Sequence, residues 1–521
     1  MNPLLTMGQA LSAQARLQPN RIGARDLDRS ISFATWNDRA CRLANALTGL
    51  GLRKGDRVAV LAYNRLEWAE IYVAAAKAGL IAVPINFRLV GPEIRFILQN
   101  CGASALVVED ALLGPVEEIR ADIPAAPERF IHIGVGPAPA GWHAYEALLQ
   151  AAASTEPEAD IQARDPWCLM YTSGTTGNPK GAIRGHGGMA MLALMTQVEL
   201  GLRQHDEALL VMPMCHANSL NFFSAFLYRG APVGIFSRAS FDPELCLRTL
   251  AGTGTTFTSL VPTHYEMMLD CPAAKADGGF GRIEKLMVSS APARVETKRA
   301  IMAMFPNSGL FETYGSTEAG WVTMLHPDEQ FERLGTVGRE VVGSAPIRLL
   351  DEDGREVPDG QPGELYSCSP YAFDGYWNLP EKTAEAFRGV YLTVGDIALR
   401  DADGYIRLLD RKKNMIITGG ENVYPTEVEA VLAAHPAVRD VAVIGRPDDK
   451  WGERVEAAVV LRDGASASSA DLIAWSRDRL AGFKRPRAIT FLTPEEMPRN
   501  TTGKILHRVL KDLLAQRSPS A

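Results

Sequence analysis

Apolar residues along the first part of the chain alternate between two periods. FATWNDRACRLANALTGLG (33–51) has apolar positions three to four residues apart, which predicts a helix, whereas DRVAVLA (56–62) is a short apolar run typical of a strand. The same pair of patterns follows in EWAEIYVAAAKAGL (67–80) and IAVPI (81–85). Alternation of this kind predicts an α/β fold with parallel sheets wrapped by helices.

Later segments extend this pattern to about residue 345 and then change character. Further strands are predicted at EALLVMPM, APVGIFS, TTFTSLVP and KLMVSS, whereas residues 346–409 carry short strands broken by turns such as DEDGREVPDGQPGE and DADGY. The last hundred residues combine a helix at YPTEVEAVLAAHP, two adjacent strands and two helices around AITFLT. We therefore predict a large N-terminal domain (1–410) with a β-rich subdomain (346–409), and a small α+β domain (411–521).

Composition narrows the class of protein. A chain of 521 residues, 46% hydrophobic and 22% charged, is expected to fold throughout into about three or four packed units. The net charge of −7 and the scattered Lys and Arg residues argue against nucleic acid as a partner. No leader-like N-terminus and no long apolar run is seen, so we expect a cytoplasmic protein without a membrane span. The oligomeric state stays open, with a homodimer as one alternative.

Cysteine usage predicts reduced, mostly buried thiols. The seven cysteines are odd in number and widely spaced, and no CxxC pair suggests a disulfide framework or a zinc site.

The loop YTSGTTGNPKG (171–181) is the first candidate for chemistry, because it leaves the apolar run WCLM and precedes a helical pattern. Its glycines let backbone N–H groups approach an anion, its hydroxyls add donors and Lys180 adds a charge, so the loop suits a polyphosphate. It is not a Walker A loop, because Pro179 stands where that motif, counted from Gly174, needs its second glycine. On composition alone, a plain surface loop is an equal alternative.

Three later segments carry matching chemistry. YGSTE (314–318) joins a glycine turn to a hydroxyl and a carboxylate, which together can hold a phosphate and its Mg²⁺. Asp396 is a candidate acceptor for ribose hydroxyls, Arg411 follows it, and NTTGK places Lys504 in a loop before the terminal helix. Taken singly, each of these three charged residues is more often a solvated surface group. For Lys504 the NTTGK context reverses that preference, and the other two are weighed with the resemblance that follows.

Together and in this order, the motifs resemble the AMP-forming acyl-CoA synthetase superfamily, the adenylate-forming enzymes that include fatty-acyl, aryl and acetyl-CoA ligases. The resemblance runs from GLRKGDRVAVLAYN (51–64) to TGKILHRVLKD (502–512), nearly the entire chain. It implies a ligase that uses ATP, Mg²⁺ and coenzyme A, with a mobile C-terminal domain.

The resemblance also assigns roles to individual residues. It gives catalytic roles to Lys504, Glu318, Thr172 and His216. It gives the binding of Mg²⁺ to Glu318 and Thr176. ATP and AMP contacts fall to Thr172, Ser173, Gly174, Thr175, Thr176, Lys180, Ser290, Ala291, Pro292, Tyr314, Gly315, Thr317, Asp396, Arg411 and Lys504. For His216, a core histidine with satisfied hydrogen bonds is an equal alternative.

The implied chemistry needs no protein nucleophile. A substrate carboxylate attacks the α-phosphorus of ATP, pyrophosphate leaves, and a thiol then attacks the acyl-adenylate to give a thioester and AMP. The protein supplies alignment and cationic stabilisation, the role that the resemblance gives to Lys504. Between the two steps the small domain is expected to swing about a hinge at Lys413. Many members carry Asp at the position of Asn414, a departure that bears on the energetics of this swing.

The thiol and the acid are less specified. Coenzyme A is the expected thiol, with contacts implied at Arg88, Gly419, Gly420, Trp451, Phe483, Lys484 and Arg485, although the basic turn GFKRPR is also compatible with an ordinary surface turn. The acyl pocket is implied at His216, Asn218, Ser219, Phe222, Ser289, Thr313, Gly315 and Trp321. The side chains of Ser289 and Trp321 are larger than those at the same positions of many fatty-acyl members. We therefore expect a short, medium-chain or aromatic acid rather than a long-chain one.

Two other functions stay open. One is an adenylating enzyme that loads a carrier protein, or releases the acyl-adenylate, instead of using free coenzyme A. The other is a catalytically silent nucleotide-binding regulatory protein on the same fold, against which Lys504, Glu318 and Asp396 speak.

Overall fold

The computed structural model describes residues 5–172, 179–272, 280–289, 293–418, 421–477, 479–499 and 503–517. The chain divides into two compact units. The first unit comprises Met1–Leu334, Glu340–Pro346 and Ser367–Leu392. The second comprises Gly335–Arg339, Ile347–Tyr366 and Thr393–Ala521. The predicted boundary at residues 410 and 411 falls inside the second unit, and the hinge at Lys413 stays a prediction.

A seven-stranded sheet forms one layer of the first unit, in the order β7-β6-β5-β3-β4-β8-β9. All its pairs are parallel except that of β8 with β9. The strands are β3 (Arg57–Leu61), β4 (Ile81–Pro84), β5 (Ala105–Glu109), β6 (Phe130–Ile133), β7 (His143–Ala144), β8 (Pro166–Thr172) and β9 (Lys180–Gly185).

A nine-stranded sheet forms the second layer, in the order β16-β15-β14-β13-β12-β10-β11-β1-β2. Its centre, from β14 to β11 and on to β1, is parallel. The strands are β1 (Ile22–Arg25), β2 (Ser30–Ser32), β10 (Ala208–Leu210), β11 (Val233–Ile235), β12 (Phe257–Leu260), β13 (Lys285–Ser289), β14 (Gly309–Ser316), β15 (Gly320–Leu325) and β16 (Arg339–Glu340). These two sheets confirm the predicted α/β architecture.

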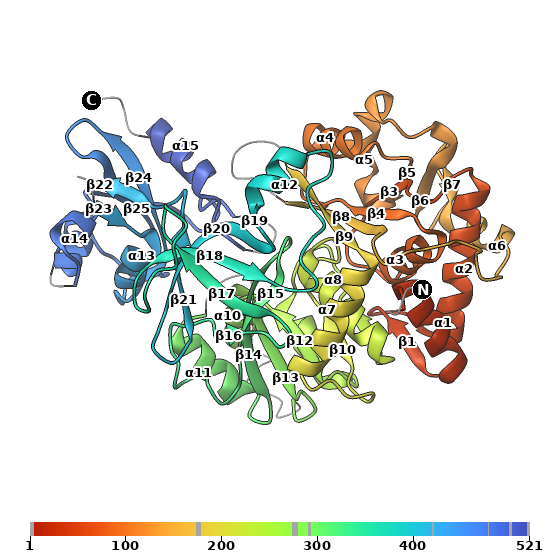
Figure 1. Cartoon of the computed structure of the whole chain (residues 1–521), viewed down its shortest axis with the longest axis horizontal. Coiled ribbons are helices and arrows are strands. Elements are labelled where there is room, and N and C mark those ends of the chain that lie inside the picture. The colour runs from red at the N-terminus through yellow and green to blue at the C-terminus, as the bar shows by residue number, and fades with distance from the viewer. Residues whose placement is uncertain are drawn as a thin grey trace. The chain divides into compact units, whose positions relative to one another are not determined.

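Helices fill the space between the two sheets and cover their outer faces (Figure 1). The largest apolar core joins both sheets to α1 (Met7–Leu17), α2 (Phe33–Gly49), α3 (Glu67–Ala78), α6 (Tyr145–Ala151), α7 (His186–Glu199) and α8 (Ala217–Arg229). The outer face of the seven-stranded sheet packs on α4 (Gly91–Cys101) and α5 (Leu113–Glu117). The outer face of the nine-stranded sheet packs on α9 (Pro243–Gly252), α10 (Pro262–Asp270) and α11 (Val295–Met304). A further helix of this unit is α12 (Pro380–Ala386).

The helix α2 shows how the sequence pattern becomes structure. Ser32 caps its N-terminus by accepting a hydrogen bond from the Thr35 N–H. Trp36, Leu43 and Leu47 recur at helical spacing and are buried, so one face of the helix packs into the large core. The helical period read from the sequence is confirmed.

Two smaller sheets form in the C-terminal part of the chain. One has the order β17-β18-β20-β19, with β21 paired to β20, and the other β23-β22-β25-β24, with β26 paired to β25. The strands are β17 (Ala345–Leu350), β18 (Gly363–Cys368), β19 (Phe387–Arg388), β20 (Tyr391–Arg400), β21 (Ile406–Arg411), β22 (Ile416–Thr418), β23 (Glu421–Val423), β24 (Val438–Asp448), β25 (Gly452–Leu461) and β26 (Ala488–Phe491). The helices are α13 (Pro425–Ala433), α14 (Ser469–Arg477) and α15 (His507–Arg517).

The cysteines agree with the expectation of reduced, mostly buried thiols. All seven cysteines are free thiols, and only Cys368 is not fully buried. Within the described ranges, no helix has the length and apolar character needed to cross a membrane.

A buried histidine in the first unit makes stability depend on pH. His186 begins α7, is 1% exposed and packs on Trp167 with ring centroids 6.2 Å apart. Neither of its ring nitrogens has a hydrogen-bond partner. Burial lowers the pKa of His186 to about 4, an effect that Asp165 opposes and Lys54 assists. The folded state therefore keeps this imidazole neutral at a pH where the unfolded chain binds a proton.

We expect stability to fall as the pH drops from 6.5 toward 4, because in that window only the unfolded state binds the proton of His186. The loss is about 1.4 kcal/mol per pH unit for one such group. Urea unfolding at pH 7 and pH 5 measures it, and His186→Gln should reduce the difference between the two pH values by about 2 kcal/mol. Equal differences in the two proteins would remove His186 from this role.

Candidate functional site

The second unit brings Asp396 and Arg411 together. Asp396 lies in β20 and Arg411 ends β21, and the two are direct cross-strand partners in the antiparallel pair. Arg411 Nε lies 3.2 Å from Asp396 Oδ1, and the Asp396 residue is 9% exposed. The sheet register therefore orients a guanidinium and a carboxylate side by side, at two of the predicted ATP and AMP contacts.

Lys504 lies in the same electrostatic environment. Surrounding protein atoms and the charge of Arg411 lower the pKa of Lys504, while Asp396 and Asp410 raise it. The residue as a whole is exposed, so water screens part of this effect. Arg499 and Ile505 form an isolated antiparallel bridge next to Lys504 in the sequence. Three residues far apart in sequence, Asp396, Arg411 and Lys504, are thus electrostatically coupled in one unit.

In the first unit, the predicted phosphate loop joins two paired strands. Thr172 ends β8, Lys180 begins β9, and the two residues are register partners. Thr172 Oγ1 lies 3.4 Å from the Lys180 carbonyl oxygen, which it contacts as a donor. Four residues predicted to contact phosphate, Ser173, Gly174, Thr175 and Thr176, lie outside the described residues.

The turn between β14 and β15 carries Thr317 and Glu318. Gly315 precedes it at a point where a Cβ atom would lie 2.1 Å from the Gly320 carbonyl oxygen, so only glycine fits. The Glu318 residue is 9% exposed, and its Oε1 accepts a hydrogen bond of 2.9 Å from the Tyr376 hydroxyl. Glu318 therefore has one carboxylate oxygen already bonded, and the tight hairpin holds its backbone.

Half of the predicted acyl-pocket residues lie on α8 or at its N-cap, and the others lie in β13, β14 and the antiparallel β15. Ser289 ends the parallel strand β13, at the edge of an α/β sheet where ligands usually bind. Asn218 Nδ2 donates to Ser289 Oγ at 2.8 Å and to Ser259 Oγ at 3.2 Å. Ser259 lies one residue before the end of β12, and Ser289 ends β13. The structure thus brings two predicted residues into one polar cluster and adds Ser259, which the sequence did not single out.

Aromatic rings fill the space beside this cluster. Trp321 is 6% exposed, its ring centroid lies 5.1 Å from that of Phe222, and its indole N–H donates to Thr196 Oγ1 at 2.9 Å. Phe222 in turn lies 4.7 Å from Phe257. Ser219 and Thr313, also predicted for the pocket, are buried and donate to backbone carbonyls. The aromatic and hydroxyl side chains at positions 219, 222, 313 and 321 would therefore form closely packed walls of the predicted acyl pocket.

His216 is a neutral imidazole at neutral pH. Burial lowers its pKa to about 4, and the positive charge of Arg88 adds to this effect. His216 is also the residue before the first turn of α8. It can accept or donate a hydrogen bond there, but it supplies no positive charge to a developing anion.

The predicted coenzyme A residues are spread over both units. Arg88 is exposed in the first unit. In the second unit Trp451 is 41% exposed, Lys484 Nζ pairs with Glu427 Oε1 at 2.7 Å, and Arg485 donates to backbone carbonyls of positions 477 and 480. Gly419 and Gly420 of this set, and Ser290, Ala291 and Pro292 of the nucleotide set, lie outside the described residues.

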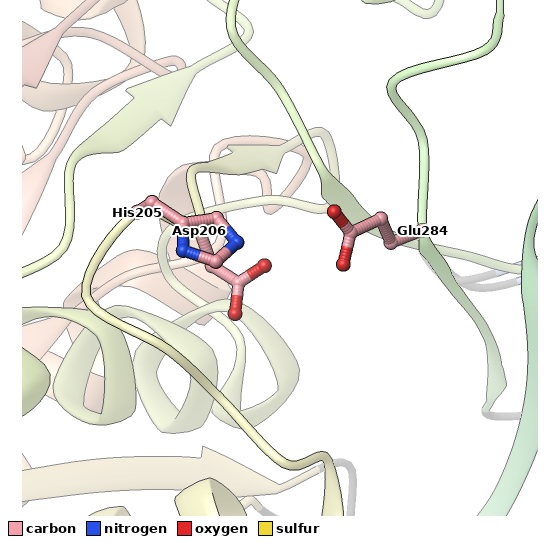
Figure 2. Close-up of side chains that lie close together, drawn as sticks. All are labelled: His205, Asp206 and Glu284. Carbon is pink, nitrogen blue, oxygen red and sulfur yellow. The ribbon is translucent and has the colours of Figure 1, made fainter.

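One cluster with metal-ligand chemistry was not predicted. His205, Asp206 and Glu284 place ligand atoms within 4.8 Å of one another (Figure 2). The Asp206 carboxylate already accepts from Lys285 Nζ at 3.0 Å and from the Thr256 hydroxyl at 2.8 Å. Because the lysine ammonium already compensates the acidic charge, we assign this cluster a structural role.

Two other residues escaped the sequence reasoning. Arg184 is 3% exposed and donates to the Thr317 carbonyl at 2.6 Å, and Tyr376 bonds Glu318. A buried arginine in a strand gives no sequence signal of its own, since most arginines are exposed. Only the fold shows that both side chains reach the YGSTE motif.

Comparison with known proteins identifies the family. Residues 11–377 match the model of the AMP-binding enzymes, and residues 427–504 match the C-terminal domain of the same enzymes. The chain is 35% identical over 497 residues to a feruloyl-CoA synthase of an Amycolatopsis species, covering 95% of this chain and 96% of that protein. It is 33% identical to a fatty acid–[acyl-carrier-protein] ligase of Streptomyces coeruleorubidus, covering 98% and 96%.

A solved structure gives the same result. The crystal structure of an anthranilate CoA ligase in complex with anthranoyl-AMP is similar with a TM-score of 0.90 and 29% identity, covering 99% of each chain. The matched models, the sequence relatives and this fold agree over nearly the whole chain. The chain therefore belongs to the AMP-binding enzyme family, as one of its adenylate-forming acid–thiol ligases.

Proposed function

We propose that this protein ligates an aromatic carboxylic acid to coenzyme A through an acyl-adenylate, consuming ATP and releasing AMP and pyrophosphate. The observation that carries the choice of acid is the ring cluster beside Asn218. Phe222 packs against both Phe257 and Trp321, and these packed rings would shorten an acyl pocket lined by Phe222 and Trp321. Flat aromatic walls next to a polar cluster favour a planar acid with a hydrogen-bonding group. A short or medium-chain acid is the second candidate.

The nucleotide is proposed to bind through the residues at the two strand ends and in the hairpin turn. Lys180 and Thr172 would contact phosphates, Asp396 and Arg411 the ribose, and Lys504 the reacting carboxylate and α-phosphate. Mg²⁺ fits Glu318, because this cation prefers carboxylate oxygens and Oε1 alone is bonded to Tyr376. When bound, the ion would neutralise charge on the phosphates.

The reaction is tested with a panel of acids scored by acid-dependent pyrophosphate exchange and by thioester formation with coenzyme A. The panel contains hydroxylated and plain benzoic and phenylpropenoic acids, hexanoic acid, decanoic acid and palmitic acid. We expect the aryl acids to give the highest kcat/KM, and a preference for palmitic acid would overturn the proposed substrate class.

The thiol is tested in the same assay. Relatives include both coenzyme A ligases and a carrier-protein ligase. Thioester formation with free coenzyme A is expected. Adenylate formation without a coenzyme A product, together with transfer to a carrier protein, would favour the carrier-loading alternative. A cytoplasmic location and a homodimer stay predictions.

Trp321→Leu tests the ring cluster as the limit on acid length. Removing the indole leaves space beside Phe222, so we expect kcat/KM for decanoic acid relative to benzoic acid to rise at least about tenfold, since each added methylene in an apolar site is worth about that much. The ratio is measured by pyrophosphate release.

Thr196→Val is the matched control for this variant. It removes the acceptor of the Trp321 indole N–H while keeping the ring and the side-chain volume. Its kcat/KM for decanoic acid relative to benzoic acid should stay within about twofold of the wild-type ratio. Equal shifts in both variants would show that mobility of the indole, rather than the space it fills, sets the length of the acid.

A further inference from the structure

A short segment, residues 373–377, lies between the strand after the phosphate loop and the hairpin turn at Glu318, and is hydrogen-bonded to both. The Ile183 N–H donates to the Gly375 carbonyl at 2.9 Å, and the Ile183 carbonyl accepts from the Asp374 N–H at 3.0 Å. At the other end of the segment, the Phe373 N–H donates to the Glu318 carbonyl at 2.7 Å. The segment is therefore bonded through its backbone to both predicted phosphate-binding elements of the first unit.

Tyr376, in the middle of this segment, contacts both elements with its side chain. Its hydroxyl donates to Glu318 Oε1 at 2.9 Å, and Lys180 Nζ lies 4.2 Å from the centre of its ring. The residue is 8% exposed. A cation over a ring face is attracted by the ring, and a hydroxyl donating to a carboxylate makes a strong, charge-assisted hydrogen bond. One side chain thus links the lysine of the loop to the acid of the turn.

Arg184 fixes the backbone of the same turn from another side. Its Nη1 donates to the Thr317 carbonyl at 2.6 Å, and its Nη2 contacts the sulfur of Met189 at 3.4 Å. Burial lowers the pKa of Arg184 to about 10, so it remains a cation at neutral pH. With the backbone of Thr317 and Glu318 held by Arg184 and Phe373, the rotation of the Glu318 carboxylate is the freedom left for Tyr376 to restrict.

We propose that Tyr376 is a positioning residue that orients the Glu318 carboxylate for Mg²⁺ and keeps it in a fixed relation to Lys180. The proposal rests on the proposed function, which assigns Glu318 to the metal. With Oε1 engaged by the hydroxyl, the carboxylate is held in one rotamer, in which Glu318 would serve as a ligand for the ion. Without the hydroxyl the carboxylate samples several rotamers, and each productive metal contact costs additional side-chain entropy.

Tyr376→Phe tests this proposal, because it removes the hydroxyl and keeps the ring under Lys180. We expect the Mg²⁺ concentration for half-maximal pyrophosphate exchange to rise about tenfold, the loss expected for one hydrogen bond to a charged group. Saturating Mg²⁺ should restore kcat to within about twofold of the wild type, because the ring and the backbone contacts are intact.

A second readout needs no turnover. Mn²⁺ binding to the protein with a non-hydrolysable ATP analogue, followed by electron paramagnetic resonance, should weaken by the same factor of about ten in Tyr376→Phe. This measurement separates the proposal from the choice of acid. If the wild type activates no acid in the panel, the proposed function fails, while the Mn²⁺ titration still reports on Tyr376.

Tyr145→Phe is the matched control. The Tyr145 hydroxyl also donates to a buried carboxylate, that of Glu70 at 2.7 Å, in the contact of α6 with α3. It should leave the Mg²⁺ and Mn²⁺ dependences unchanged. Equal Mn²⁺ affinity in wild type and Tyr376→Phe would overturn the proposal, and so would a fall in kcat that saturating Mg²⁺ does not reverse.

Discussion

Lys504→Ala is expected to slow adenylation by about 10² to 10³-fold, the loss found when one preorganised electrostatic donor is removed from a reaction centre. The charges of Arg411 and Asp396 both shift the pKa of Lys504, so its ammonium interacts electrostatically with the proposed ribose contacts. The variant should still convert a supplied acyl-adenylate to the thioester, because that step needs no charge from Lys504. Pyrophosphate exchange measures the first step, and single-turnover thioester formation measures the second.

Lys511→Ala, a lysine of α15, is the control for a simple change of charge near the C-terminus. It should leave both half-reactions unchanged. An equal loss in both half-reactions of Lys504→Ala would refute a role confined to adenylation.

Lys413→Pro is expected to show the reverse of the Lys504→Ala pattern: adenylation is kept and thioester formation is lost. Proline fixes the backbone angle φ of this position near −65°, so a swing about Lys413 would be restricted. Lys413 lies in the turn after β21, where the Lys412 N–H donates to the Gly395 carbonyl and the Asn414 N–H to the Arg411 carbonyl. We expect adenylation to change less than about threefold and thioester formation to fall at least about tenfold, the range expected when a gating motion is hindered.

Lys413→Ala separates the two contributions of the residue. It removes the ammonium while leaving φ free to rotate, so its thioester formation should stay near that of the wild type. An unchanged overall rate in Lys413→Pro would remove this residue from the hinge role.

The sequence was sufficient to predict the α/β layers of the fold and the class of chemistry. Helical and strand periods in residues 33–85 predicted α2, β3, α3 and β4, because burial of one face imposes a period that the chain must carry locally. Likewise Lys504, Asp396 and Glu318 were singled out, because each lies in a short segment that carries the family resemblance. Chemistry that depends on adjacent residues can be read from the sequence.

Side-chain partners supplied by distant segments could not be read in this way. Ser259 joins Asn218 and Ser289 only because β12 and β13 are neighbours in the nine-stranded sheet. The neutral state of His216 follows from burial and from Arg88, neither of which its sequence context indicates. Desolvation and cross-strand pairing depend on the whole packed structure, so these features needed coordinates.

The sequence by itself determined the resemblance to the adenylate-forming ligases, because the phosphate loop, the YGSTE turn and NTTGK are local motifs that occur together and in order. Tertiary structure alone decided how that turn is held. Arg184 and Tyr376 come from different strands and segments, and their contacts with Thr317 and Glu318 exist only after β9 and the 373–377 segment have paired. The physical reason is that a hydrogen bond or a ring contact depends on distances of a few ångströms, which long-range packing sets and local sequence does not.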